Sequence, residues 1–192
     1  MWQTATVISC FRGMRAGVVD QLADEEMRQL LEQHRDRIVG LLTETPGLSL
    51  DENTCAGFLH GFMTVAAYFV PDDSVYQQSM FPVLGGTYLA AIDAPPEATP
   101  NLAGARRFLA DLAAAMDADP DAVILSTAQR AILEERIRGG FATTPDVPID
   151  HATLAGFIVG LMYATNFLPS DDATGPIMLI ATVRQIADDL PT

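Results

Sequence analysis

The sequence predicts an all-α protein, a bundle of seven or eight helices built from two duplicated units with pseudo-twofold symmetry. Two observations support this fold class. Apolar residues recur along most of the chain at helical spacing, and no segment resembles a sheet. The stretch 56–63 returns 99 residues later as 155–162, and at that offset 14 of the 37 positions from 37 to 73 are identical. So many identities without a gap indicate an internal duplication.

The duplication also defines the domain organisation. We expect one domain over residues 1–192, with repeat units 2–93 and 101–191 joined by the proline-rich connector 94–100. The connector is too short to separate the units into independent domains. A chain of 192 residues is long enough to bury one sizeable core.

The net charge of the chain limits the classes of molecule that it is expected to bind. The formal net charge is -14, and all 11 basic residues are arginine. Nucleic-acid binding requires a basic surface, so direct binding of nucleic acid is not expected. A basic protein partner is compatible with this charge, as is an acidic surface that only maintains solubility. Two cysteines are too few for a disulfide scaffold, and the first residues lack a basic segment typical of secretory signals, which favours a cytoplasmic protein.

The repeated stretch predicts a buried helix in each unit. From residue 51 to 70 apolar side chains cover every face, which is typical of a helix at the centre of a core or in a membrane. The apolar run of about 16 residues is shorter than the roughly 20 that a bilayer requires, so the core is favoured. Glycines one turn apart, Gly57 with Gly61 and Gly156 with Gly160, lower helix propensity in both copies. We therefore expect the two helices to cross at these glycines.

The remaining helices follow from periodicity and from capping residues. Thr45-Pro46 and Thr144-Pro145 end a helix in each unit, and Ser49 or Asp51 caps the first central helix. Pro82 predicts a break or kink near 81–82. The expected helices are 4–16, 20–44, 51–70, 76–92, 101–117, 121–140, 150–167 and 176–190.

The histidines provide the first candidate site. His60 stands where the second copy has a valine, and Asn166 is a polar residue on the corresponding face of the other central helix. A polar spot in an apolar groove would suit a ligand, which predicts a binding pocket lined by His60, Met63, Tyr163 and Asn166. The alternative, which we favour, is a histidine and an amide whose hydrogen bonds are satisfied inside the core.

Two acidic pairs provide the second candidate site. Asp72-Asp73 and Asp171-Asp172 occupy equivalent places in the two units. A third carboxylate at the spacing of a magnesium motif is missing, and helix capping explains both pairs. We expect them to contribute to an acidic interaction surface. No metal site, cofactor or catalytic residue is predicted, because no histidine lies at metal-ligand spacing from another ligand and no nucleophile motif occurs.

The first repeat resembles a known family. The segment Leu59-His60-Gly61-Phe62-Met63-Thr64, introduced by Leu50-Asp51, is similar to the Leu-His-Gly-Phe-Leu-Thr signature of the YecA/YgfB family of small all-helical bacterial proteins. The expected helix 150–167 contains Gly156-Phe157-Ile158-Val159-Gly160-Leu161, which resembles the Gly-Phe-x-x-Gly-Leu motif in the later half of that family. The resemblance covers some 10 residues in each half. The second motif lacks the family's Trp-Cys lead-in, and the cysteine-rich zinc tail of some members is absent. It implies an all-α bundle with a regulatory or binding role and no catalytic residue.

The sequence thus favours a non-enzymatic protein–protein interaction or regulatory module over an enzyme. Its partner would be a protein, with a basic surface as one candidate and a second copy of the chain as another. The alternative function is a carrier or sensor of a small apolar ligand, bound in a pocket between the two central helices.

Overall fold

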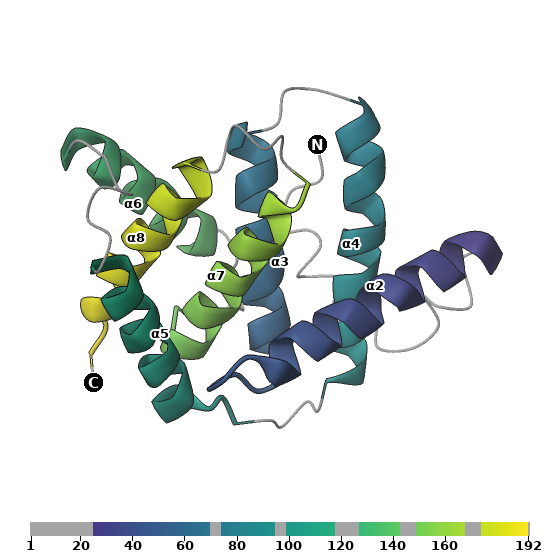
Figure 1. Ribbon diagram of the computed structural model, residues 1–192, viewed down its shortest axis with the longest axis horizontal. Helices are drawn as coiled ribbons and strands as arrows, with labels where there is room; N and C mark the ends of the chain where they lie inside the picture. The colour runs from purple at the N-terminus through teal and green to yellow at the C-terminus, as the bar shows by residue number, and fades with distance from the viewer. Residues whose placement is uncertain are drawn as a thin grey trace.

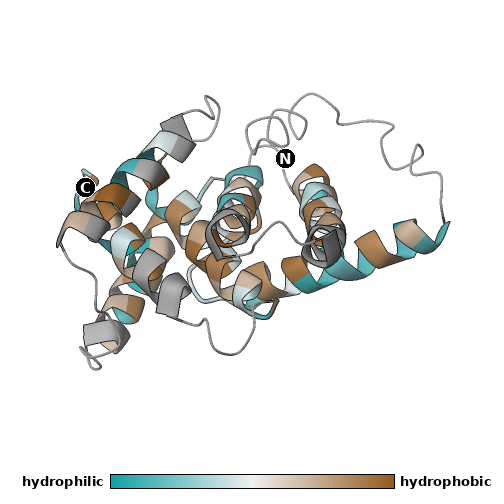
Figure 2. Cartoon of the chain, turned by 90° about the horizontal axis from the view of Figure 1, so that it is seen from above, coloured by the Kyte–Doolittle hydropathy of each residue, from teal (hydrophilic) through white to brown (hydrophobic). Residues whose placement is uncertain are grey.

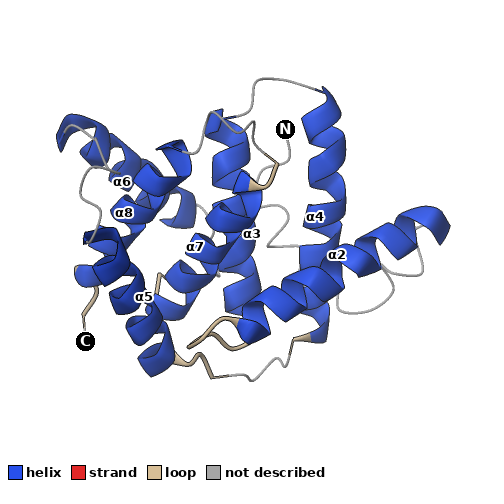
Figure 3. Cartoon of the chain, viewed as in Figure 1, coloured by secondary structure: helices blue, strands red, loops and turns tan. Residues whose placement is uncertain are grey.

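A computed structural model describes residues 25–69, 74–94, 99–117, 127–142, 149–167 and 174–191. Within these ranges the chain forms seven α-helices and no strand (Figure 3). The all-α class is therefore confirmed, whereas the expected helix at 4–16 lies outside the described residues. The helices are α2 (Glu25–Glu44), α3 (Glu52–Phe69), α4 (Ser74–Asp93), α5 (Leu102–Asp117), α6 (Thr127–Ala142), α7 (His151–Thr165) and α8 (Thr174–Asp188).

The helices α3 and α7 lie together in the middle of the molecule (Figure 1). On one side of this pair, α2 packs against α4, and α4 packs against α3. On the other side, α5 and α8 pack against α7, and α6 packs against α8. Helices from both halves of the chain therefore contribute to one hydrophobic core.

The two central helices are buried on all sides over their middle turns. Every residue from 54 to 62 is buried, and so is every residue from 152 to 161. Phe58, Phe62 and Phe157 are among the largest fully buried side chains. The uniformly apolar sequence of these segments is thus explained by burial in a protein core.

Four glycines form the contact between α3 and α7. A Cβ atom added to any of them would overlap a backbone carbonyl group of the other helix, so a larger residue requires the backbones to separate. Gly57 faces Thr153, and four residues later on each helix Gly61 faces Phe157, so α3 and α7 run parallel. The crossing expected at these glycines is confirmed. The glycines and the residues whose carbonyls they face are Gly57 with Thr153, Gly61 with Phe157, Gly156 with Thr54, and Gly160 with Phe58.

The parallel arrangement brings the N-terminal ends of α3 and α7 to the same end of the molecule, and an aspartate caps each. The Oδ1 atom of Asp51 accepts a hydrogen bond from the Thr54 amide at 2.7 Å, and that of Asp150 accepts one from the Thr153 amide at 2.8 Å. Of the two expected caps for the first central helix, Asp51 is the one that the structure shows. The two carboxylates also offset the positive ends of two parallel helix dipoles.

The helix α2 is held on α4 by a second close approach. Figure 2 shows hydrophobic and hydrophilic residues alternating along α2, as expected for an amphipathic surface helix. Its Leu31 side chain packs over Gly85, and its backbone at His34 and Arg35 lies over Gly86. Arg35 also forms an ion pair with Asp93 of α4. These contacts fix the position of α2 relative to the core.

Of the break or kink expected near residues 81–82, the break is contradicted by the structure, and the kink stays a prediction. The helix α4 continues from Ser74 to Asp93 with Pro82 inside it. A proline within a helix removes one hydrogen bond and costs about 3 kcal/mol. Here Pro82 is buried, and burial of Val83 and Ala90 on the same helix offsets that cost.

The other expected helix boundaries agree with the structure to within a few residues wherever the boundary lies among the described residues. The helix α2 ends at Glu44, immediately before Thr45-Pro46, and Gly47 then adopts a positive φ of 87°. Such a conformation favours glycine because it has no side chain. Among the described helices, none has both the length and the apolarity that crossing a membrane requires.

Candidate functional site

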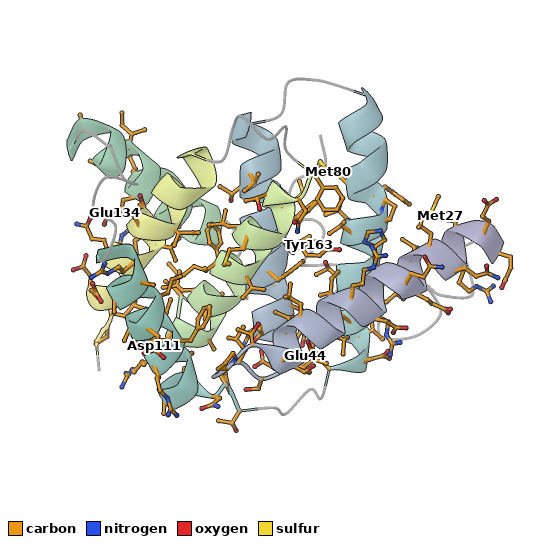
Figure 4. The ribbon with its side chains drawn as sticks, in the orientation of Figure 1. Met27, Glu44, Met80, Asp111, Glu134 and Tyr163 are labelled. Carbon is orange, nitrogen blue, oxygen red and sulfur yellow. The ribbon has the colours of Figure 1, made fainter. Side chains whose placement is uncertain are left out.

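Tyr163 lies at the centre of a group of aromatic and polar side chains from several helices. It projects from the last turn of α7 toward α2 and α4 (Figure 4). Its ring lies 5.5 Å from that of Phe58 and 6.3 Å from that of Phe62, both on α3, and 5.7 Å from that of Phe167. Tilted aromatic pairs at such separations stabilise by about 0.5–1.5 kcal/mol beyond the burial of their area.

Two residues of α2 surround the hydroxyl end of the Tyr163 ring. The Tyr163 Oη atom lies 3.4 Å from Nδ1 of His34. Arg37, one turn further along α2, lies near enough for its charge to lower the pKa of the Tyr163 hydroxyl, although burial raises that pKa by more. A tyrosine, a histidine and an arginine therefore meet between two helices that are far apart in sequence. We refer to His34, Arg37 and Tyr163 as the Tyr163 corner.

The protonation of His34 and Tyr163 follows from their partial burial, whereas Arg37 is exposed. Burial is the main cause that lowers the pKa of His34, and the positive charge of Arg37 lowers it further. The imidazole is thus uncharged at neutral pH, and so is the tyrosine. At neutral pH the corner carries one positive charge, on Arg37, beside two neutral groups that can each donate or accept a hydrogen bond.

The four residues of the predicted ligand pocket occupy different environments. His60 is 6% exposed, Met63 and Tyr163 are half-buried, and Asn166 is exposed at the C-cap of α7, where its amide donates to the Tyr163 carbonyl at 3.0 Å. Burial lowers the pKa of His60 to about 4. His60 is therefore a neutral core residue at pH 7.

Helix geometry directs His60 and Tyr163 to different sides of α3. Residues advance by about 100° around a helix axis, so His60 lies roughly 160° from Phe58 and from Phe62 on α3. Those two phenylalanines are the ones whose rings contact Tyr163. Tyr163 therefore lies beside α2 and the phenylalanine side of α3, and not on the side of α3 that carries His60.

The predicted interaction residues Asp72, Asp73, Asp171 and Asp172 lie outside the described residues. Among the residues that are described, no three histidine, cysteine, aspartate or glutamate side chains gather as a metal site would require. Cys55 is buried in α3, and burial raises the pKa of its thiol, as expected of a small apolar core residue.

Sequence reasoning missed His34 and Arg37 as site residues. His34 lies at helical spacing from the apolar residues Leu31 and Ile38, as a core residue would, and Arg37 is one of several charged residues on the same helix. One signal was present: the residue 99 positions after His34 is Leu133, so this position differs between the copies as His60 does. Such a difference identifies a position without identifying its partner, because Tyr163 lies 129 residues away.

No known family model, curated protein or solved structure matches this chain. The resemblance to the YecA/YgfB signature therefore stays a prediction.

Proposed function

We propose that this chain is a non-enzymatic protein–protein interaction or regulatory module built from two duplicated units related by a pseudo-twofold axis between α3 and α7. The reciprocal glycine contacts support the symmetry. Gly57 faces Thr153 while Gly156 faces Thr54, and these four residues are two pairs at the 99-residue offset. The aspartate caps of the two central helices are another such pair.

The tight packing beside His60 is the observation that carries the interaction function. A Cβ atom at the adjacent Gly61 would overlap the carbonyl of Phe157, and His60 itself is nearly inaccessible. This close backbone contact and the burial of His60 support a packed core, rather than a ligand pocket, at the crossing of α3 and α7. Function is then assigned to the surface, which carries most of the net charge.

The surface favours a partner with a basic face. Exposed carboxylates occur on α2, α4, α5, α6 and the C-terminal end of α8, and the exposed arginines among the described residues are fewer. Opposite charges on two proteins increase their association rate. The exposed acidic residues described by the structure are Glu25, Glu26, Glu32, Asp36, Glu44, Asp93, Asp111, Glu135, Asp188 and Asp189.

The salt dependence of association tests this function. The partner captured by the tagged chain would be purified, and its association rate measured between about 50 and 500 mM salt, where the Debye length falls from roughly 14 to 4 Å. We expect a fall of tenfold or more, and a lower rate at low salt for the Asp36→Asn/Glu44→Gln variant. A rate that does not respond to salt would contradict the acidic interaction surface. Sedimentation of the chain alone would separate this outcome from self-association into a homodimer.

A second candidate function, a carrier or sensor of a small apolar ligand, is favoured by one observation. Tyr163 and Phe167 are only half-buried, although their rings belong to the same aromatic group as the buried Phe58 and Phe62. A partly exposed aromatic group beside a few polar atoms is a common composition for a ligand site. This candidate replaces the predicted pocket at His60 by one at the Tyr163 corner.

A further inference from the structure

Arg37 differs from the other arginines of α2 in its partner. Arg28 lies 3.6 Å from a carboxylate oxygen of Glu25, and Arg35 contacts both Asp36 and Asp93. The partner that the structure describes for Arg37 is the neutral hydroxyl of Tyr163. In a chain with 25 acidic residues and 11 basic ones, a cation placed beside two neutral polar groups is a position suited to an external anion.

The Tyr163 corner also provides an apolar surface next to this cation. The rings of Tyr163 and Phe167 are half-buried, and behind them lies the Phe62 ring, 5.8 Å from that of Phe167 in an edge-to-face arrangement. An apolar or aromatic group placed against these rings would lose contact with water while a charged group at its end reached Arg37.

The two copies of the repeat differ at two of the three residues that form this corner. The positions equivalent to His34 and Tyr163 hold Leu133 and Thr64 in the other copy, whereas an arginine stands at the position equivalent to Arg37. The repeat therefore does not require a histidine or a tyrosine at these two places, which supports a role for both side chains beyond packing.

We propose that the Tyr163 corner binds a small monocarboxylate with an apolar or aromatic body, its carboxylate on Arg37 and the Tyr163 hydroxyl and its body on the rings of Tyr163 and Phe167. A single cation flanked by neutral donors matches one negative charge. A dianion such as phosphate would leave a second charge unpaired beside a strongly acidic surface. The inference rests on the carrier function above and is independent of a basic protein partner.

A pair of probes that differ in charge alone tests the carboxylate. Binding of 3-phenylpropanoate and of its uncharged analogue 3-phenylpropanamide would be measured by calorimetry at pH 7. We expect the carboxylate to bind at least tenfold more tightly than the amide. Equal affinities would overturn the carboxylate inference and leave the carrier function standing, whereas absence of saturable binding by both probes would overturn both.

Matched variants locate the site. Arg37→Gln should abolish the preference for the carboxylate, and Tyr163→Phe, which keeps the ring, should weaken carboxylate binding several-fold while leaving amide binding unchanged. Arg107→Gln on α5 removes the same charge at an exposed position and should leave both affinities unchanged. If Arg107→Gln weakened carboxylate binding as much as Arg37→Gln, a general charge effect would replace the site.

The His34 ring gives a readout that a purely structural role would not change. A carboxylate bound at the corner places a negative charge near the imidazole, so saturation with 3-phenylpropanoate should raise the pKa of His34 in an NMR titration. The pKa of His60 on the other side of α3 should stay the same. A His34 pKa that does not respond to the saturated probe would overturn the assignment to this corner.

Discussion

The α3–α7 crossing and the outer helices α2 and α6 both contain glycines that occur in both copies, but the glycines have different surroundings. At the crossing, Gly61 and Gly160 face the backbone of the other helix. On the outer helices, Gly40 and Gly139 are also 99 residues apart, yet a Cβ atom at either one would meet nothing within 4 Å. The same residue repeated at equivalent positions is thus a packing requirement in one region and not in the other.

The histidines show the same difference between centre and periphery. His60 on α3 is nearly inaccessible, and burial lowers its pKa to about 4. His34 on α2 is half-buried, and its pKa is lowered by burial together with Arg37. The depth of each histidine in the core thus determines how strongly burial changes its pKa. Substitutions at the centre should accordingly change stability more than substitutions at the periphery.

Protonation of His60 at low pH should cause the largest change in stability. Because the folded-state pKa of His60 is below its unfolded value of 6.5, the unfolded state binds more protons between the two values. Stability from the neutral ring is complete above pH 6.5 and is lost as pH falls toward about 4, by about 3 kcal/mol at most. His60→Val should keep the fold at pH 7 and remove this loss. Parallel pH curves of unfolding free energy for the two proteins would contradict the assignment.

The central glycine contact comes next. Gly61→Leu should lower the free energy of unfolding by more than about 2 kcal/mol, because the group it meets is a backbone carbonyl that cannot rotate away. Urea denaturation measures the change, with Gly40→Leu as the control that meets open space. A free energy of unfolding unchanged by Gly61→Leu would contradict the backbone contact between α3 and α7.

The two helix caps test the crossing at its N-terminal end. Asp51→Ala and Asp150→Ala should each destabilise by about 1 kcal/mol through loss of the cap. Asp51→Asn keeps a cap and removes a carboxylate whose pKa is raised, mainly by burial. Because a raised pKa favours the protonated form in the fold, the wild type should lose stability relative to Asp51→Asn as pH rises from about 3 to 7. A constant difference between these two proteins would show that the Asp51 carboxylate is not desolvated.

The outer glycines should give the smallest effect, with the opposite sign. Gly40→Ala and Gly139→Ala should each raise the free energy of unfolding by roughly 0.5–1 kcal/mol, since alanine has the higher helix propensity and no neighbour is displaced. Thermal unfolding of the single and double variants measures the change. A loss of stability in either variant would indicate a contact at the outer face, and the comparison with Gly61 would then fail.

Much of the fold was predictable because its signals are local or repeated. Thr45-Pro46 ends a helix by backbone sterics alone, and Asp51 caps the next helix through an amide three residues away. The glycine crossing was predictable because both copies keep Gly57 and Gly61 at a cost in helix propensity. Pro82 shows the limit of such local rules, since packing of α4 maintains a helix through a residue that favours its interruption.

The sequence by itself determined the helical class, the repeat and the residues at the centre, because periodicity and capping act within a few residues of the chain. Only the tertiary structure decided that α3 and α7 run parallel and that His34 meets Tyr163. Periodicity shows which face of a helix is apolar, but it leaves open which neighbour covers that face and at what rotation. That choice depends on contacts between segments 129 residues apart, and it brings His34 and Arg37 of α2 to the hydroxyl group of Tyr163.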